Sequence, residues 1–114
     1  MSLQSRLQDL YTELAKLGDC YHYFAPSEAT APYIVWAEES EDTSFDADNH
    51  KVRQALSGYV DYFTKTEFDT TFDAIQSALD SFEGLSWTWE ATQYGDPTQD
   101  DDNLIHSTWS WRMR

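Results

Sequence analysis

The side chains that could carry out chemistry are few and widely separated in this chain of 114 residues. The three histidines, His22, His50 and His106, show no paired spacing, and a lone histidine is more often structural than catalytic because catalysis needs convergent partners. The single cysteine, Cys20, follows Asp19 and has no neighbouring positive charge that would lower the pKa of its thiol. We therefore expect an inert thiol, no disulfide within the chain and no catalytic residue.

Two acidic clusters offer oxygen ligands of the kind that calcium takes. They are Asp46-x-Asp48-Asn49 and Asp100-Asp101-Asp102-Asn103. Neither cluster has the central glycine and the distal glutamate of a calcium-binding loop. The four glycines are not clustered, so a glycine-rich phosphate loop is also missing from the sequence. Solvated acidic loops are the favoured interpretation, and we expect no metal and no cofactor.

The chain is strongly acidic, with 21 acidic and 7 basic residues and a formal net charge of −14. Binding to phosphate backbones and to anionic membranes is driven by Lys and Arg, so this charge disfavours nucleic acid and membranes as partners. Ten of the acids gather in two segments that we predict to be loops. They are Glu38, Glu39, Glu41, Asp42, Asp46, Asp48, Asp96, Asp100, Asp101 and Asp102.

Composition favours a single folded domain over residues 1–114, since 40% of the residues are apolar and 16% are aromatic. The N-terminal segment has a helical pattern rather than the basic and continuously apolar pattern of a signal peptide. No apolar run approaches the roughly 20 residues that span a bilayer. We therefore expect a protein that is intracellular at synthesis.

Tryptophans alternate with polar residues near the C-terminus, where Leu85-x-Trp87-x-Trp89 recurs as Trp109-x-Trp111-x-Met113. A period of two places side chains on one face of a strand. A turn-forming acidic stretch separates the two segments, which predicts an antiparallel hairpin. Packing beneath a helix is the favoured role of these rings, and contact with a partner is the alternative. The candidate packing or partner-face aromatics are Trp36, Trp87, Trp89, Trp109 and Trp111.

Two segments show helical periodicity. Residues 2–17 place leucines on one face, with Ser2 as the N-cap. Residues 66–82 carry the clearest stripe, and Thr66 and Asp69 predict a short-armed capping box at its start. The members of this stripe are Phe68, Phe72, Ile75, Leu79 and Phe82.

Strands are expected at 21–24, 33–37 and 52–64, in addition to the tryptophan hairpin. The run 33–37 is apolar throughout, so both of its faces should be covered. Gly58 lies inside the longest strand and indicates a bulge or a close backbone approach. The acidic segment 38–49 should be a loop.

These elements predict an α+β fold in the order α-β-β-β-α-β-β. Its antiparallel sheet would have about four or five strands, and both helices would pack on one face. The second face is less apolar, so it would be free for water or for a partner.

Several short motifs follow one another in a specific order. Pro32-Tyr33-Ile34-Val35-Trp36 precedes Ala47-Asp48-Asn49-His50-Lys51-Val52, and Tyr62-Phe63-Thr64 precedes the second helix. Leu104-Ile105-His106 then leads into the final aromatic strand. In this order the chain resembles the small tail-completion or tail-terminator proteins of long-tailed bacteriophages and prophages, over roughly residues 3–113. Tryptophan-rich strands here replace the more usual mixture of Tyr, Phe and Val.

The resemblance implies a structural protein whose copies form a ring, of six in similar proteins, at the head–tail junction. Such a ring caps the tail tube and offers a surface for head attachment, so its partners are tail-tube and head-completion proteins. It would be a virion component assembled in the cytoplasm of the host bacterium. The family has no catalytic residues to carry over. The two acidic loops would lie at the lumen or the ring face, where negative charge lets DNA slide without sticking.

Two other functions use the same sequence features. An acidic DNA mimic that blocks a host nucleic-acid-binding protein would spread carboxylates over one face at phosphate-like spacing. The clustering of ten acids in two segments favours the assembly protein instead. A small hydrolase would need a carboxylate pair, and with 21 acids chance pairs are common.

Overall fold

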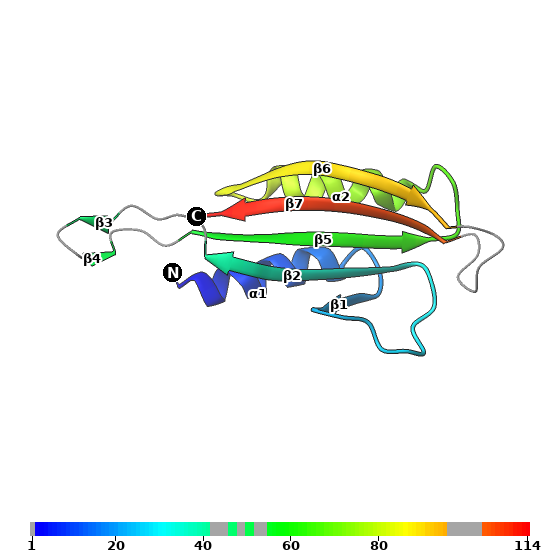
Figure 1. The fold of residues 1–114 in the computed structure, drawn as a ribbon, viewed down its shortest axis with the longest axis horizontal. Coiled ribbons are helices and arrows are strands. Elements are labelled where there is room, and N and C mark those ends of the chain that lie inside the picture. Colours follow the sequence, from blue (N-terminus) through cyan, green and yellow to red (C-terminus); the bar gives the residue numbers. More distant parts are fainter. Residues whose placement is uncertain (1, 42–45, 48–49, 52–54, 96–103) are drawn as a thin grey trace.

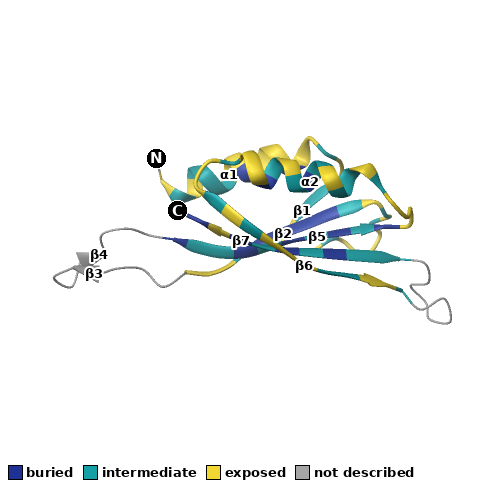
Figure 2. Cartoon of the chain, turned by 90° about the horizontal axis from the view of Figure 1, so that it is seen from above, coloured by how far each residue is buried: buried dark blue, intermediate teal, exposed yellow. Residues whose placement is uncertain are grey.

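Two helices and a five-stranded sheet form two layers in the computed structural model (Figure 1). The structure describes residues 2–41, 46–47, 50–51, 55–95 and 104–114. The helices are α1 (Leu3–Ala15) and α2 (Thr70–Ser81). Both lie on the same face of the sheet (Figure 2). This confirms the predicted α+β fold and its order of elements.

The strands of the main sheet are arranged in the order β1-β2-β5-β7-β6. Their bounds are β1 (Cys20–His22), β2 (Tyr33–Glu41), β5 (Leu56–Thr64), β6 (Leu85–Tyr94) and β7 (Ile105–Met113). A separate two-stranded sheet consists of β3 (Asp46–Ala47) and β4 (His50–Lys51). Among the described residues, no helix is long and apolar enough to cross a membrane.

The main sheet is mixed and not purely antiparallel as predicted. β1 pairs with β2 in parallel, with Cys20 beside Ile34 and His22 beside Trp36. The connection between the two strands is long enough to bring the chain back to the end where β1 began, which a parallel pair requires. The other neighbouring strands of this sheet are antiparallel.

The N-terminal helix begins as predicted, since the Ser2 side chain accepts a hydrogen bond from the Ser5 backbone N–H. The second helix begins later than predicted. Asp69 is its N-cap, and its side chain accepts from the Thr71 N–H. Thr66 therefore does not cap the helix. Phe68 lies outside the helix because its φ of 57° is left-handed and cannot continue a right-handed turn.

The core lies between the helices and one face of the sheet. Leu10 and Leu14 of α1 and Ile75 and Leu79 of α2 have no exposed surface. The β5 side chains alternate as predicted, with Val60 and its like-facing neighbours buried and the residues between them only partly buried. The buried core cluster comprises Leu10, Leu14, Ile34, Trp36, Val60, Tyr62, Ile75, Leu79, Trp109, Trp111 and Met113.

Gly58 confirms the predicted close backbone approach in β5. A Cβ atom at this position would clash with the Ala37 carbonyl oxygen and with the Trp111 ring. The bulge itself falls on the neighbouring strand, where the register of β2 shifts between Glu38 and Ser40. The start of the predicted strand, 52–54, lies outside the described residues.

Candidate functional site

The five candidate tryptophans divide between the core and the surface. Trp36, Trp109 and Trp111 are at most 2% exposed, which confirms the packing role for these three. The hairpin pairs Trp87 with Trp111 and Trp89 with Trp109. Trp87 is partly buried, and its Nε1 donates to the Asp80 carboxylate at 3.1 Å. Trp89 is 49% exposed although it is on the helix side of the sheet.

The prediction that the acidic segment 38–49 forms a loop is partly wrong. Strand β2 continues through Glu38, Glu39 and Glu41, because a bulge lets the chain pair with β5 beyond the apolar run. Asp46 is in β3. The remaining candidate acids lie outside the described residues: Asp42, Asp48, Asp96, Asp100, Asp101 and Asp102.

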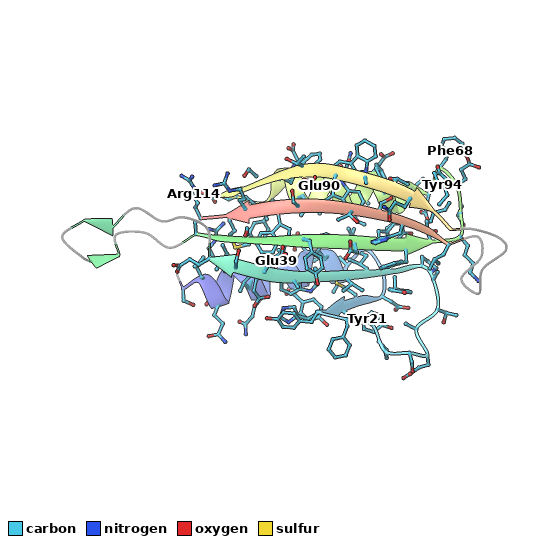
Figure 3. The ribbon with its side chains drawn as sticks, in the orientation of Figure 1. Tyr21, Glu39, Phe68, Glu90, Tyr94 and Arg114 are labelled. Atoms are coloured by element: carbon cyan, nitrogen blue, oxygen red, sulfur yellow. The ribbon has the colours of Figure 1, made fainter. Side chains whose placement is uncertain are left out.

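An open groove lies at the end of the sheet where β5 and β6 end, beside the start of α2. Its volume is about 580 Å³. Three of its aromatic side chains are conspicuously exposed: Phe68 (94%), Tyr94 (66%) and Trp89 (49%). Figure 3 shows that Phe68 and Tyr94 lie at the same end of the sheet. We call this feature the aromatic groove. Its lining residues are Tyr62, Thr64, Thr66, Glu67, Phe68, Asp69, Phe72, Asp73, Trp89, Thr92, Tyr94, Ile105 and Ser107.

The groove owes its shape to a bulge in β6. The register of β6 with β7 shifts between Trp89 and Ala91, so Glu90 is an extra residue. Beyond the bulge Tyr94 lies opposite Ile105 and points to the helix side, whereas strict alternation from Trp89 would have pointed it away. The alternating sequence pattern therefore did not identify Tyr94 as a site residue. Phe68 was missed because its spacing predicted a buried position on the second helix.

Asp69 fixes the floor of the aromatic groove. Its carboxylate accepts hydrogen bonds from the Tyr62 hydroxyl at 2.7 Å, the Thr64 hydroxyl at 2.8 Å and the Thr71 N–H at 2.9 Å. Partial burial raises the pKa of this carboxyl, but these hydrogen bonds outweigh it and hold the pKa below the ordinary value. Burial, followed by the bond to Asp69, raises the pKa of the Tyr62 hydroxyl.

Phe68 combines strain with exposure. A left-handed φ of 57° is uncommon for a large side chain, and such a conformation costs about 1–3 kcal/mol. No burial of this ring offsets the cost, because Phe68 is 94% exposed. Strained residues of this kind cluster at functional sites, which makes Phe68 the most informative residue of the groove.

The sheet face away from the helices carries a second aromatic surface. Rings from four adjacent strands follow one another across it: Tyr21 of β1, Tyr33 of β2, Phe63 of β5 and His106 of β7. Their centroids are 6.0, 4.9 and 4.3 Å apart in that order. All four are partly exposed. We call these residues the ring row.

Beside the ring row, Asp61, His106 and Thr108 form a polar cluster. His106 Nε2 is 2.9 Å from Asp61 Oδ1, and the Thr108 hydroxyl donates to that same oxygen at 2.8 Å. In a nucleophilic triad the histidine joins the acid and the hydroxyl through different nitrogens. Here Nε2 faces both groups, so His106 does not relay a proton from Thr108, and the cluster links β5 to β7.

The edge of the sheet at β1 holds the remaining sequence candidates. The His22 ring stacks on Trp36 at 4.3 Å and on Tyr23 at 4.1 Å, and its Nε2 lies 2.7 Å from the Glu38 carboxylate. Burial raises the pKa of the Cys20 thiol to about 12, so this thiol is a poor nucleophile. His50 is in β4.

Within the described part of the chain, no group of three or more His, Cys, Asp or Glu side chains is placed to hold a metal ion. No protein-family model matches the chain, and no curated protein matches it either. The arguments for function therefore come from the two aromatic surfaces, the acidic charge and the resemblance of the sequence motifs.

Proposed function

We propose that this protein is a structural adaptor in the assembly of a long-tailed phage or prophage virion. It would act in tail completion or as a tail terminator at the head–tail junction. Copies would associate into a ring, contact tail-tube and head-completion proteins, and function without catalysis or a cofactor. The order of the sequence motifs supports this assignment, and the fold leaves a surface that suits it.

The observation that carries the proposal is the ring row on the uncovered sheet face. A large partly exposed aromatic surface on a small domain is typical of a protein interface. No helix of the described chain packs on this face (Figure 2). The four side chains of the ring row include no carboxylate, Lys or Arg, so a second copy can approach these rings without burying an unpaired charge there. Glu90 lies farther along the face, where its carboxylate accepts a hydrogen bond from the Ser110 hydroxyl at 2.6 Å.

The same face argues against the alternative of a DNA mimic. A mimic needs carboxylates that are free to meet the cationic groups of its target. Asp61, in the middle of this face, has a side chain only 19% exposed and is already bonded by His106 and Thr108. Aromatic rings flank it, which suits packing between proteins better than phosphate imitation.

Sedimentation velocity tests the proposal. At about 0.5 M salt, where charge repulsion is screened to within a few ångströms, the native protein should associate as its concentration rises. Phe63→Ser should abolish that association, because it removes the ring that stacks on both Tyr33 and His106.

A second variant controls for the possibility that Phe63→Ser fails to fold. Thr88→Glu places a negative charge at an exposed position of the same face, opposite Ser110. It should also abolish association while leaving the melting temperature unchanged. Phe68→Ser, in the aromatic groove on the opposite side, should associate normally. Association that survives both Phe63→Ser and Thr88→Glu would overturn the proposal.

A further inference from the structure

The aromatic groove is separate from the ring row, and self-association through the sheet face leaves it open. It is on the helix side, between the N-terminal end of α2 and the last residues of β6. The exposed rings of Phe68, Trp89 and Tyr94 would therefore stay uncovered in an assembly formed through the sheet face.

The charged side chains that line the aromatic groove are all acidic. Its lining contains the carboxylates of Glu67, Asp69 and Asp73 and, among described residues, no Lys or Arg. Asp69 is occupied by its three hydrogen bonds. Glu67 and Asp73 are exposed and form no ion pair or hydrogen bond within the described part of the chain. Two carboxylates beside exposed rings are suited to a cation, which aromatic faces also attract.

The size and exposure of the groove favour a protein segment as its occupant. A volume of about 580 Å³ accommodates several side chains. Phe68 projects beyond the groove with almost its whole surface exposed, so a buried small molecule would leave this ring uncovered. An extended segment that lies across Trp89, Tyr94 and Phe68 would cover it.

We propose that the aromatic groove binds a segment of a partner protein in which a Lys or Arg alternates with apolar residues. The cation lies between Glu67 and Asp73, and the apolar side chains contact the exposed rings. The strained Phe68 acts as an anchor that is already held in its bound position. The inference rests on the proposed function only for the identity of the partner, which would then be a neighbouring protein of the assembly.

The probe is an acetylated eight-residue peptide of alternating lysine and leucine, added to isotope-labelled protein. Indole N–H signals in NMR spectra report the site of binding, because Trp89 lines the groove and Trp87 does not. A Trp89→Phe variant identifies the signal. The Trp89 signal should shift saturably while the Trp87 signal stays in place. A lysine–serine peptide of equal charge should bind at least about tenfold more weakly.

Matched variants separate the groove from the general acidity of the chain. Phe68→Ser should weaken peptide binding about tenfold, whereas Phe24→Ser, at another exposed Phe (77%), should leave it unchanged. Glu67→Gln with Asp73→Asn should weaken binding by a similar factor. Glu39→Gln with Asp9→Asn, which removes the same charge elsewhere, should change it less than about twofold.

Equal losses in the groove and control variants would overturn the inference, as would shifts spread over several indoles or no binding at all. A lower melting temperature in Asp73→Asn with unchanged peptide binding would also overturn it, because the carboxylates would then serve only the helix terminus. The two proposals can fail separately. Phe63→Ser tests the ring row, and the peptide tests the groove.

Discussion

Substitution of Asp69 by Ala should be among the most damaging polar substitutions in this protein. This one carboxylate caps α2 through the Thr71 N–H and accepts from two hydroxyls of β5. The residues that carry those hydroxyls, Tyr62 and Thr64, are only 2% and 5% exposed. Little solvent therefore reaches these two residues in the folded protein.

The magnitude follows from these three contacts. Loss of an N-cap costs about 1 kcal/mol. A buried hydroxyl left without its partner costs about 1–3 kcal/mol. The lower end applies to Tyr62, because the Thr64 and Thr71 hydroxyls stay close to its oxygen. Asp69→Ala should therefore lower the free energy of unfolding by about 3 kcal/mol and the melting temperature by roughly 12 °C.

Urea denaturation followed by circular dichroism measures this loss. Asp69→Ser is the matched control, because serine keeps the cap but does not reach the β5 hydroxyls, and it should cost about 2 kcal/mol. Adding Tyr62→Phe to Asp69→Ala should restore part of the stability by removing the unpaired donor. A loss below about 1 kcal/mol in Asp69→Ala, or equal losses in Asp69→Ser and Asp69→Ala, would show that the β5 hydroxyls do not depend on this carboxylate.

Four further predictions concern stability and charge. The pKa of Asp69 is lowered in the folded state, so the ionised carboxylate contributes to the free energy of unfolding. This contribution should be complete above the ordinary aspartate pKa and should disappear as the pH falls through the pKa of the folded state. The melting temperatures of the native protein and of Asp69→Asn, measured over a pH series, should therefore converge in acid. Phe72→Ala should cost about 3 kcal/mol, because the ring packs 4.9 Å from Trp109, and a change of melting temperature of only a degree or two would mean that this ring contributes little. A chelator should leave the melting temperature unchanged and added calcium should shift it little, whereas strong stabilisation by calcium would restore the metal interpretation of the acidic clusters. Replacement of all three aspartates at 100–102 by Asn should promote association at low salt in sedimentation experiments, and an unchanged association constant would place these charges away from the interface.

The spacing of apolar residues and the composition were sufficient to predict the layers of this fold. Each pattern arises within one short stretch of regular backbone: the helical spacing of Phe72, Ile75 and Leu79, and the alternation of the tryptophans. The pairing of β1 was not predictable in the same way. Its direction depends on how a long connection folds back, and no local pattern records that.

The aromatic groove was missed because two irregularities create it. One extra residue, Glu90, reverses which face Tyr94 occupies, and a period-two pattern has no means of placing such a bulge. Phe68 continues the apolar helical spacing in sequence, but Asp69 competes for the helix start and ends that continuation. The helix therefore begins where Asp69 caps it, and not where the apolar spacing begins at Phe68.

We propose that copies of this chain close into a ring through the uncovered sheet face. Electron microscopy of concentrated protein at high salt tests it most directly, because the net charge of −14 opposes closure when salt is low. We expect closed particles with a single subunit number, and we expect them to disappear in Phe63→Ser. Open filaments, particles of mixed size, or rings that persist in Phe63→Ser would contradict it.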